Sequence, residues 1–284
     1  MARFAHTVTV AALDRGWFEE AAGTLVDLLD ASREGPGGSV VLADGRPMEG
    51  LRLLKGRHLR PGARYGEVPA EPEEAAGEVP VEHTGAGAGD SPGAPQAVAL
   101  RTWRPSHSVE VESLVEEDGM SLKVGLRLSE PRRPRAVELS LAGHKPGGGS
   151  LYRLSGRGKA DLAAWWSAVD RPPSAPPAAR APVSGRAVHR LAKARLTLTP
   201  RPAEDGSWRI TVVLSLRGRW LLRPVGAVVL FFARGPLERG LREAAESAAE
   251  EWNTALAELT PLHGEALRAE IADALVNPDG STPL

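Results

Sequence analysis

The strongest constraint on the fold is a regular alternation of apolar and charged residues between positions 109 and 128. Valines occupy positions 109, 111 and 115, whereas glutamates occupy positions 110, 112 and 116. After Asp118-Gly119, leucines and a valine alternate with Lys123, Gly125 and Arg127. A period of two places alternate side chains on opposite faces of a strand. The pattern therefore predicts an antiparallel hairpin with one apolar face and one charged face.

Further strands follow the same pattern. Residues 194–198 and 208–216 predict a second hairpin around the polar loop 200–207. Single strands are expected at residues 4–10, 39–43, 51–55 and 137–141. Strands at both ends of the chain need a common core, so we expect one domain over residues 1–276 and a tail over residues 277–284.

Helical spacing appears in three places. Asp14 is a predicted N-cap for a helix ending before Gly35, and residues 160–169 form a short helix that contains Trp165-Trp166. From Pro236 to Leu259, apolar residues recur every three or four positions, which predicts a long amphipathic helix with a stripe that must be buried. A short last helix is expected near residues 267–275. The predicted fold class is α+β, with an antiparallel sheet packed on the long C-terminal helix.

Two segments have the composition of loops. Residues 66–96 contain six Gly, five Pro and seven carboxylates without a Lys or Arg, so we expect a disordered acidic loop. The segment is a solvated spacer or an acidic arm that docks on an Arg-rich face. Residues 171–186 contain five Pro, which predicts a stiff, exposed loop.

Composition excludes several classes of function. Lys and Arg total 35 against 36 Asp and Glu, so the chain has no overall excess of positive charge with which to bind a phosphate backbone. We therefore expect no sequence-specific nucleic-acid partner. The chain has no Cys, which excludes disulfides, thiolate metal sites and a cysteine nucleophile. The longest clean apolar run, residues 225–232, is far shorter than the roughly 20 residues of a spanning helix. We therefore expect no transmembrane segment and a cytoplasmic protein.

The motifs of known chemistry are missing or incomplete. Gly156-Arg157-Gly158-Lys159 resembles part of a phosphate loop, but the required first glycine is Arg153 and the residue after the Lys is Ala160. A weaker possibility is that backbone N–H groups there bind an anion together with Arg153, Arg157 and Lys159; a solvated glycine loop is the alternative. No nucleophile elbow and no close pair of His residues occurs. The sequence predicts neither a metal nor a cofactor, and an enzyme is the less favoured class.

One hypothesis places a ligand pocket between the sheet and the long helix. Its predicted sheet residues are His6, Trp208, Val212 and Leu214, and its predicted helix residues are Ala245, Ala248 and Trp252. Small residues on the helix either let the sheet approach closely or leave space for an apolar ligand. Core packing of the two tryptophans and a hydrogen-bonded His6 at the core edge are the plain alternatives.

The end of the chain resembles a known superfamily. Residues 188–259 read as strand, loop, strand and long helix, with RGRWLLRP at positions 217–224, and the opening strand is followed by a helix. This is similar to START-like (SRPBCC, helix-grip) proteins, including polyketide-cyclase-like members. The resemblance implies a curved antiparallel sheet around the C-terminal helix, an apolar ligand between them and no universal catalytic residue. This chain is longer, carries two Pro-rich insertions and has an extra helix with Trp165-Trp166.

Three functions remain open on this basis. The first is non-catalytic binding of an apolar small molecule or lipid. The second is a protein-interaction, assembly or regulatory role that uses Trp165-Trp166, the acidic loop and the Arg-rich segments. The third is a cyclase- or hydrolase-type enzyme, which a cavity holding His6 beside a carboxylate would favour.

Overall fold

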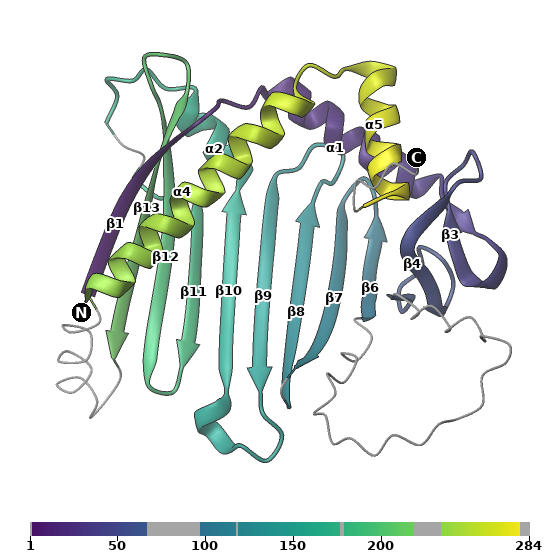
Figure 1. Cartoon of the computed structure of the whole chain (residues 1–284), viewed down its shortest axis with the longest axis horizontal. Helices are drawn as coiled ribbons and strands as arrows, with labels where there is room; N and C mark the ends of the chain where they lie inside the picture. The colour runs from purple at the N-terminus through teal and green to yellow at the C-terminus, as the bar shows by residue number, and fades with distance from the viewer. Residues whose placement is uncertain (1, 67–96, 118, 177–178, 219–233, 279–284) are drawn as a thin grey trace, which may run out of the picture.

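A computed structural model describes residues 2–66, 97–117, 119–176, 179–218 and 234–278. Within them one antiparallel sheet of thirteen strands carries the fold (Figure 1). The strands are β1 (Ala2–Val10), β2 (Arg33–Glu34), β3 (Ser39–Val41), β4 (Pro47–Lys55), β5 (Arg64–Gly66), β6 (Ala97–Arg104), β7 (Ser108–Glu117), β8 (Met120–Ser129), β9 (Ala136–His144), β10 (Leu154–Asp161), β11 (Val183–His189), β12 (Ala192–Pro202) and β13 (Trp208–Gly218). The helices described are α1 (Arg15–Asp30), α2 (Leu162–Val169), α4 (Arg234–Leu259) and α5 (Gly264–Val276).

The order of the strands explains how the two ends of the chain meet. The sheet runs β1-β13-β12-β11-β10-β9-β8-β7-β6-β5-β4-β3-β2. The first strand thus lies at one edge, and α1 carries the chain along the upper ends of the strands to the opposite edge (Figure 1). Each later strand pairs with the next one until β13 lies beside β1.

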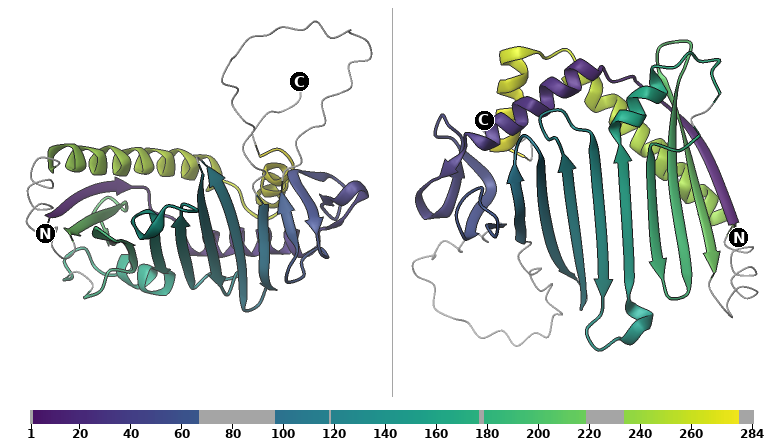
Figure 2. Two further views of the ribbon diagram at one scale, coloured as in Figure 1. Left: turned by 90° about the horizontal axis from the view of Figure 1, so that it is seen from below. Right: turned by 180° about the vertical axis from the view of Figure 1, so that it is seen from behind.

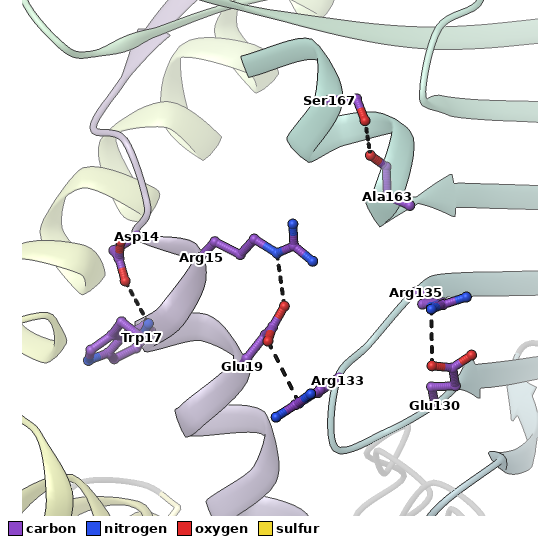
Figure 3. Close-up of polar contacts among 9 residues, drawn as sticks. All are labelled: Asp14, Arg15, Trp17, Glu19, Glu130, Arg133, Arg135, Ala163 and Ser167. Carbon is purple, nitrogen blue, oxygen red and sulfur yellow. Dashed lines mark hydrogen bonds and ion pairs between the residues drawn. The ribbon is translucent and has the colours of Figure 1, made fainter. Parts of the chain in front are cut away.

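Helix α1 is fixed at its start by side-chain contacts (Figure 3). The Asp14 carboxylate accepts a hydrogen bond of 2.7 Å from the backbone N–H of Trp17, which satisfies a free donor of the first turn. Glu19 lies between Arg15, at 2.9 Å, and Arg133, at 3.9 Å, in the connection between β8 and β9. These contacts attach α1 to the upper edge of the sheet.

The two faces of the sheet have different characters. Residues paired across antiparallel strands project from the same face, and neighbours along a strand project from opposite faces. We call the face that carries Phe4 and His6 the front face, because α4 packs on β1 there and Glu246 of α4 contacts His6. Figure 2 shows α4 above β1 when the sheet is viewed along its strands. The opposite side is the back face.

Two hydrophobic clusters hold the helices. The first joins α1, α2, α4 and α5 to the ends of β1 and β13; it contains Val10, Leu13, Trp17, Trp166, Val169, Trp208, Ala249, Leu256 and Leu267. The second lies at the other edge and includes Leu28 of α1, Ala272 of α5 and Val40, Leu42, Met48, Tyr65 and Leu100 of the sheet region. The central strands contribute few buried residues to either cluster, so the core is split between the two ends of the sheet.

Most predicted elements are present, and the α+β class with a large antiparallel sheet and a C-terminal helix is confirmed. Both predicted hairpins exist as β7–β8 and β12–β13, and Asp14 caps α1 as expected. The predicted acidic loop lies outside the described residues, except that Gly66 ends β5.

One loop prediction is wrong, and another extends four residues too far. The Gly-rich stretch around residues 154–161 is strand β10, and the expected Pro-rich loop ends at Pro182 because Val183–His189 forms β11. In both cases pairing with neighbouring strands outweighs a local composition that favours a loop.

Candidate functional site

One row of residues, paired across the strands from β1 to β7, shows which part of the front face is exposed to solvent. The row contains Phe4, Leu214, Leu196, Gly185, Gly158, Leu139, Leu126 and Val111, in order from β1 to β7. Phe4 is only 3% exposed beside α4. In the middle of the row, Leu196, Leu139 and Leu126 are 37%, 45% and 41% exposed. The central part of the front face therefore presents apolar side chains that no described element covers.

Glycines lower the floor of this region. Gly158 on β10 and Gly185 on β11 lie between Leu139 on β9 and Leu196 on β12. A Cβ added at Gly158 would meet the Leu139 Cβ at 3.6 Å, and one at Gly185 would meet the Leu196 Cβ at 3.9 Å. Both distances are ordinary contacts, so neither glycine is required by crowding. We call this strip of the front face, in which Gly158 and Gly185 leave no side chains between Leu139 and Leu196, the front-face trench.

The predicted sheet residues lie beside this trench or in the core. Val212 pairs with His6, and Leu214 pairs with Phe4, so both face α4 as expected. Trp208 is 5% exposed, and its ring lies 5.8 Å from the rings of Trp165 and Trp166. Trp208 is thus surrounded by aromatic side chains, which fits the core-anchor alternative.

The predicted helix residues do not all face the sheet. Ala245 is partly buried, but Ala248 is exposed, and the neighbouring Ala249 is buried instead. The expectation that Ala248 faces the sheet is therefore wrong by one residue. Trp252 is 37% exposed, and its indole N–H donates to the Ala11 carbonyl at 3.0 Å.

His6 lies beside a carboxylate, as the enzyme hypothesis required. Its Nε2 is 3.2 Å from the Glu246 Oε1, and a depression of about 440 Å³ adjoins it. The described lining residues are Ala5, His6, Gly235, Glu238, Arg239, Leu241 and Arg242. None of these side chains is a hydroxyl, thiol or lysine nucleophile. The contact ties α4 to β1 and supplies at most an acid–base pair.

A second histidine has a complete set of hydrogen bonds. His58 Nε2 lies 2.9 Å from the Ser32 hydroxyl, and its Nδ1 lies 3.1 Å from the Tyr65 hydroxyl. The Ser32 hydroxyl donates to the Leu29 carbonyl at 2.6 Å, and Tyr65 accepts from the Leu59 N–H at 2.8 Å.

These contacts assign the protons of the network. With Ser32 and Tyr65 each donating their only O–H, His58 donates through Nε2 and accepts at Nδ1. A histidine that donates to Ser32 cannot activate it as a base. Burial lowers the pKa of His58 and raises the pKa of Tyr65. The network is therefore structural and joins the end of α1 to the segment before β5.

The residues of the predicted anion loop lie on a strand. Arg157 and Lys159 belong to β10 and project from the back face, whereas Arg153 precedes the strand. A loop of backbone N–H donors at residues 156–159 is therefore wrong, because these residues pair with β9 and β11. Their cationic side chains belong to a larger group on the back face, which sequence analysis missed.

The described part of the chain lacks two features that would indicate a function. No cluster of three or more His, Asp or Glu side chains suited to a metal ion occurs in the part of the chain that the structure describes. Among the same residues, no helix combines the length and apolarity needed to cross a membrane.

The partner surface predicted for the adjacent tryptophans is not seen. Trp166 is 6% exposed, and Trp165 is partly buried; both rings contact Trp208. Neither tryptophan therefore projects freely from α2.

Sequence comparison with protein families and curated proteins gives no relative. A scan against models of protein families finds no match, and a search of curated proteins finds no significant match. The function must therefore be argued from the geometry of the chain itself.

Proposed function

We propose that this protein is a non-catalytic binding protein that holds an apolar small molecule or lipid in the front-face trench. The observation that carries the proposal is the row of paired residues whose ends are buried and whose middle is exposed. Leu126, Leu139 and Leu196 keep about two fifths of their surface in contact with solvent, although they lie on the face that α4 covers at β1. Contiguous exposed apolar surface of this kind marks a binding site.

The shape of the trench favours a flat or acyl ligand. Neighbouring strands lie about 4.8 Å apart, so the walls on β9 and β12 are separated by roughly 14 Å. Gly158 and Gly185 place the bare backbone at the floor, where an apolar group can lie close to the sheet. At about 25 cal/mol per Å², burial of about 200 Å² of apolar ligand surface contributes roughly 5 kcal/mol before the costs of association.

A helix-grip relationship is part of this proposal. It is supported by the position of α4, which packs on β1 at the front face (Figure 2). It is also supported by the pairing of β1 with β13, because the opening and closing segments that carry the resemblance lie side by side. The site proposed here differs from the predicted pocket, since it lies beside α4 on the central strands. A cytoplasmic location likewise stays a prediction.

An apolar fluorescent dye tests the proposal directly. We expect saturable binding to the wild-type protein at micromolar concentration and competition by fatty acids or flat aromatic compounds. Gly158→Val fills the floor of the trench, where an added Cβ makes only an ordinary contact of 3.6 Å with the Leu139 Cβ, so it should weaken dye binding at least tenfold. Ala142→Val on the back face of β9 adds the same side chain away from the trench and should bind as the wild type does.

A second pair of variants controls for general apolar exposure. Leu139→Ser removes one wall of the trench, whereas Leu114→Ser removes an equally exposed leucine, 48% against 45%, from the back face of β7. Only Leu139→Ser should reduce binding. Equal losses in both variants, or no effect of Gly158→Val, would contradict the proposed site.

A further inference from the structure

The back face of five adjacent strands collects positive charge. On β10–β13 and β1 its exposed cations are Arg3, Arg157, Lys159, Arg186, Lys193, Arg195, Arg201, Arg209 and Arg217. The same five strands contain a single carboxylate, Asp161, whose Oδ1 accepts from the Ala164 N–H at 2.9 Å to cap α2. A chain with a net charge of −1 thus concentrates nine cations on one side of these strands.

Three of these arginines form a row. Arg157 pairs with Arg186, and Arg186 pairs with Arg195, so their side chains leave the same face of three adjacent strands. Like charges at directly opposed positions repel each other. Among the described residues, none of the three has a salt bridge or a side-chain hydrogen bond.

The neighbouring strands show the opposite arrangement. Glu112 on β7 lies 2.8 Å from Lys123 and also contacts Arg101, which together lower the pKa of Glu112. Glu138 on β9 lies 3.6 Å from Lys159. Glu112 and Glu138 are therefore paired across the strands, whereas the arginine row has no ion pair within the described residues.

A depression adjoins the row. It has a volume of about 730 Å³, within the usual range of roughly 300–1,000 Å³ for small-molecule sites. Arg157, Arg186 and Arg195 line one side, and Glu110, Glu112 and Glu138 line the other, where Arg127 and Lys159 lie beside them. Between them the lining includes the small residues Gly125, Ser140 and Ser184, which leave room above the sheet.

We propose that the arginine row binds the phosphoryl group of a soluble phosphorylated small molecule whose uncharged or cationic part lies toward the glutamates. A guanidinium presents paired N–H donors that match the oxygens of phosphate, and three of them in register give several such contacts. An anion in the row also relieves the repulsion among the three arginines. This site lies on the face opposite the trench, so it does not depend on the apolar ligand.

Features of the same face disfavour nucleic acid. Single-stranded nucleic acids bind by stacking their bases on aromatic side chains in a basic groove. The described back face of β10–β13 and β1 carries cations but no aromatic side chain on which a base could stack. Glu110, Glu112 and Glu138 at the far side of the depression interrupt the continuous positive surface that a long polyanion needs. A small ligand with its phosphates at one end can place them on the arginine row and its other end near the glutamates.

Titration calorimetry with inorganic tripolyphosphate and pyrophosphate tests the proposal. We expect binding that weakens as salt concentration rises, together with an increase in melting temperature. Arg186→Gln, at the middle of the row, should weaken tripolyphosphate binding at least tenfold. Arg104→Gln removes an exposed arginine at the end of β6, outside the row, and should bind as the wild type does.

The melting temperature of the ligand-free variant shows whether Arg186→Gln has lost only the binding site or has also destabilised the fold. Because Arg186→Gln removes repulsion, its melting temperature at low salt should equal or exceed that of the wild type. Absence of tripolyphosphate binding to the wild type, or unchanged binding to Arg186→Gln, would overturn the proposal. Tighter binding of phosphatidylserine vesicles or duplex DNA through the same row would also overturn it, in favour of a membrane or a nucleic acid. Failure of dye binding in the trench would leave it unaffected.

Discussion

Trp208 should be the most costly single side chain to remove from the core that joins α2, α4 and β13. It is 5% exposed, and deletion of a large aromatic residue from a core costs about 3–5 kcal/mol. The substitution also removes two edge-to-face ring contacts, to Trp165 and Trp166, each worth about 0.5–1.5 kcal/mol. Trp208→Ala should therefore cost near the upper end of that range, about 5 kcal/mol. At about 2–4 °C per kcal/mol for chains of this size, the melting temperature should fall by roughly 10–20 °C.

Urea titration followed by circular dichroism measures this cost. Trp252→Ala is the matched control, because Trp252 is 37% exposed and mainly loses its hydrogen bond to the Ala11 carbonyl. Its cost should be about 1–2 kcal/mol. A cost below about 1 kcal/mol for Trp208→Ala, or equal costs for the two variants, would refute the assignment of Trp208 as the core anchor.

Three further outcomes follow from individual contacts. Asp14→Ala should cost about 0.5–2 kcal/mol in thermal unfolding, because it removes the cap at Trp17, and Asp14→Asn should restore most of it. Asn253→Ala should cost about 1 kcal/mol, because its side chain accepts from the Ala11 N–H at 2.7 Å; no loss would show that this contact is absent in solution. Burial lowers the pKa of His58 in the folded chain. As pH falls, the unfolded chain therefore binds a proton at His58 near the ordinary pKa of 6.5, before the folded chain does. Stability from this group is therefore present above that pH and lost as pH falls through the lower folded pKa, and His58→Gln should flatten the slope of unfolding free energy in that window.

The hairpins and caps were readable from the sequence because local patterns determine them. The alternation around Val111 and Leu126 predicts both the strands and their apolar side, and Asp14 predicts the start of α1. Strand β10 could not be read in this way, because Gly156 and Gly158 suit a loop equally well. Only pairing with β9 and β11 makes that segment a strand.

The inward side of α4 was predicted in part, because Leu256 is buried as expected whereas Ala248 and Trp252 are exposed. A period of 3.6 residues leaves the phase of a stripe uncertain by about one position, which is why Ala249 rather than Ala248 is buried. Leu241 and Ala245 fit either phase.

The two candidate sites could not be predicted, because each depends on long-range arrangement. Exposure of Leu139 follows from the positions of the helices, which cover the ends of the sheet and leave its middle open. The arginine row requires the register of three strands, and Arg157 is 38 positions from Arg195 in the chain. The glycine motif drew attention to Arg157 as part of an anion loop, but no local pattern marks Leu139, Arg186 or Arg195 as functional.

Photoaffinity labelling tests the central proposal, that apolar ligands bind in the front-face trench. A fatty acid that carries a diazirine near the methyl end of its chain would be bound to the intact protein and irradiated. The labelled positions would then be mapped by mass spectrometry. The account predicts labels around Leu126, Leu139 and Leu196, which disappear when unlabelled fatty acid competes and in the Gly158→Val variant. Labels confined to the back face or to α4, or labels that competition does not reduce, would contradict it.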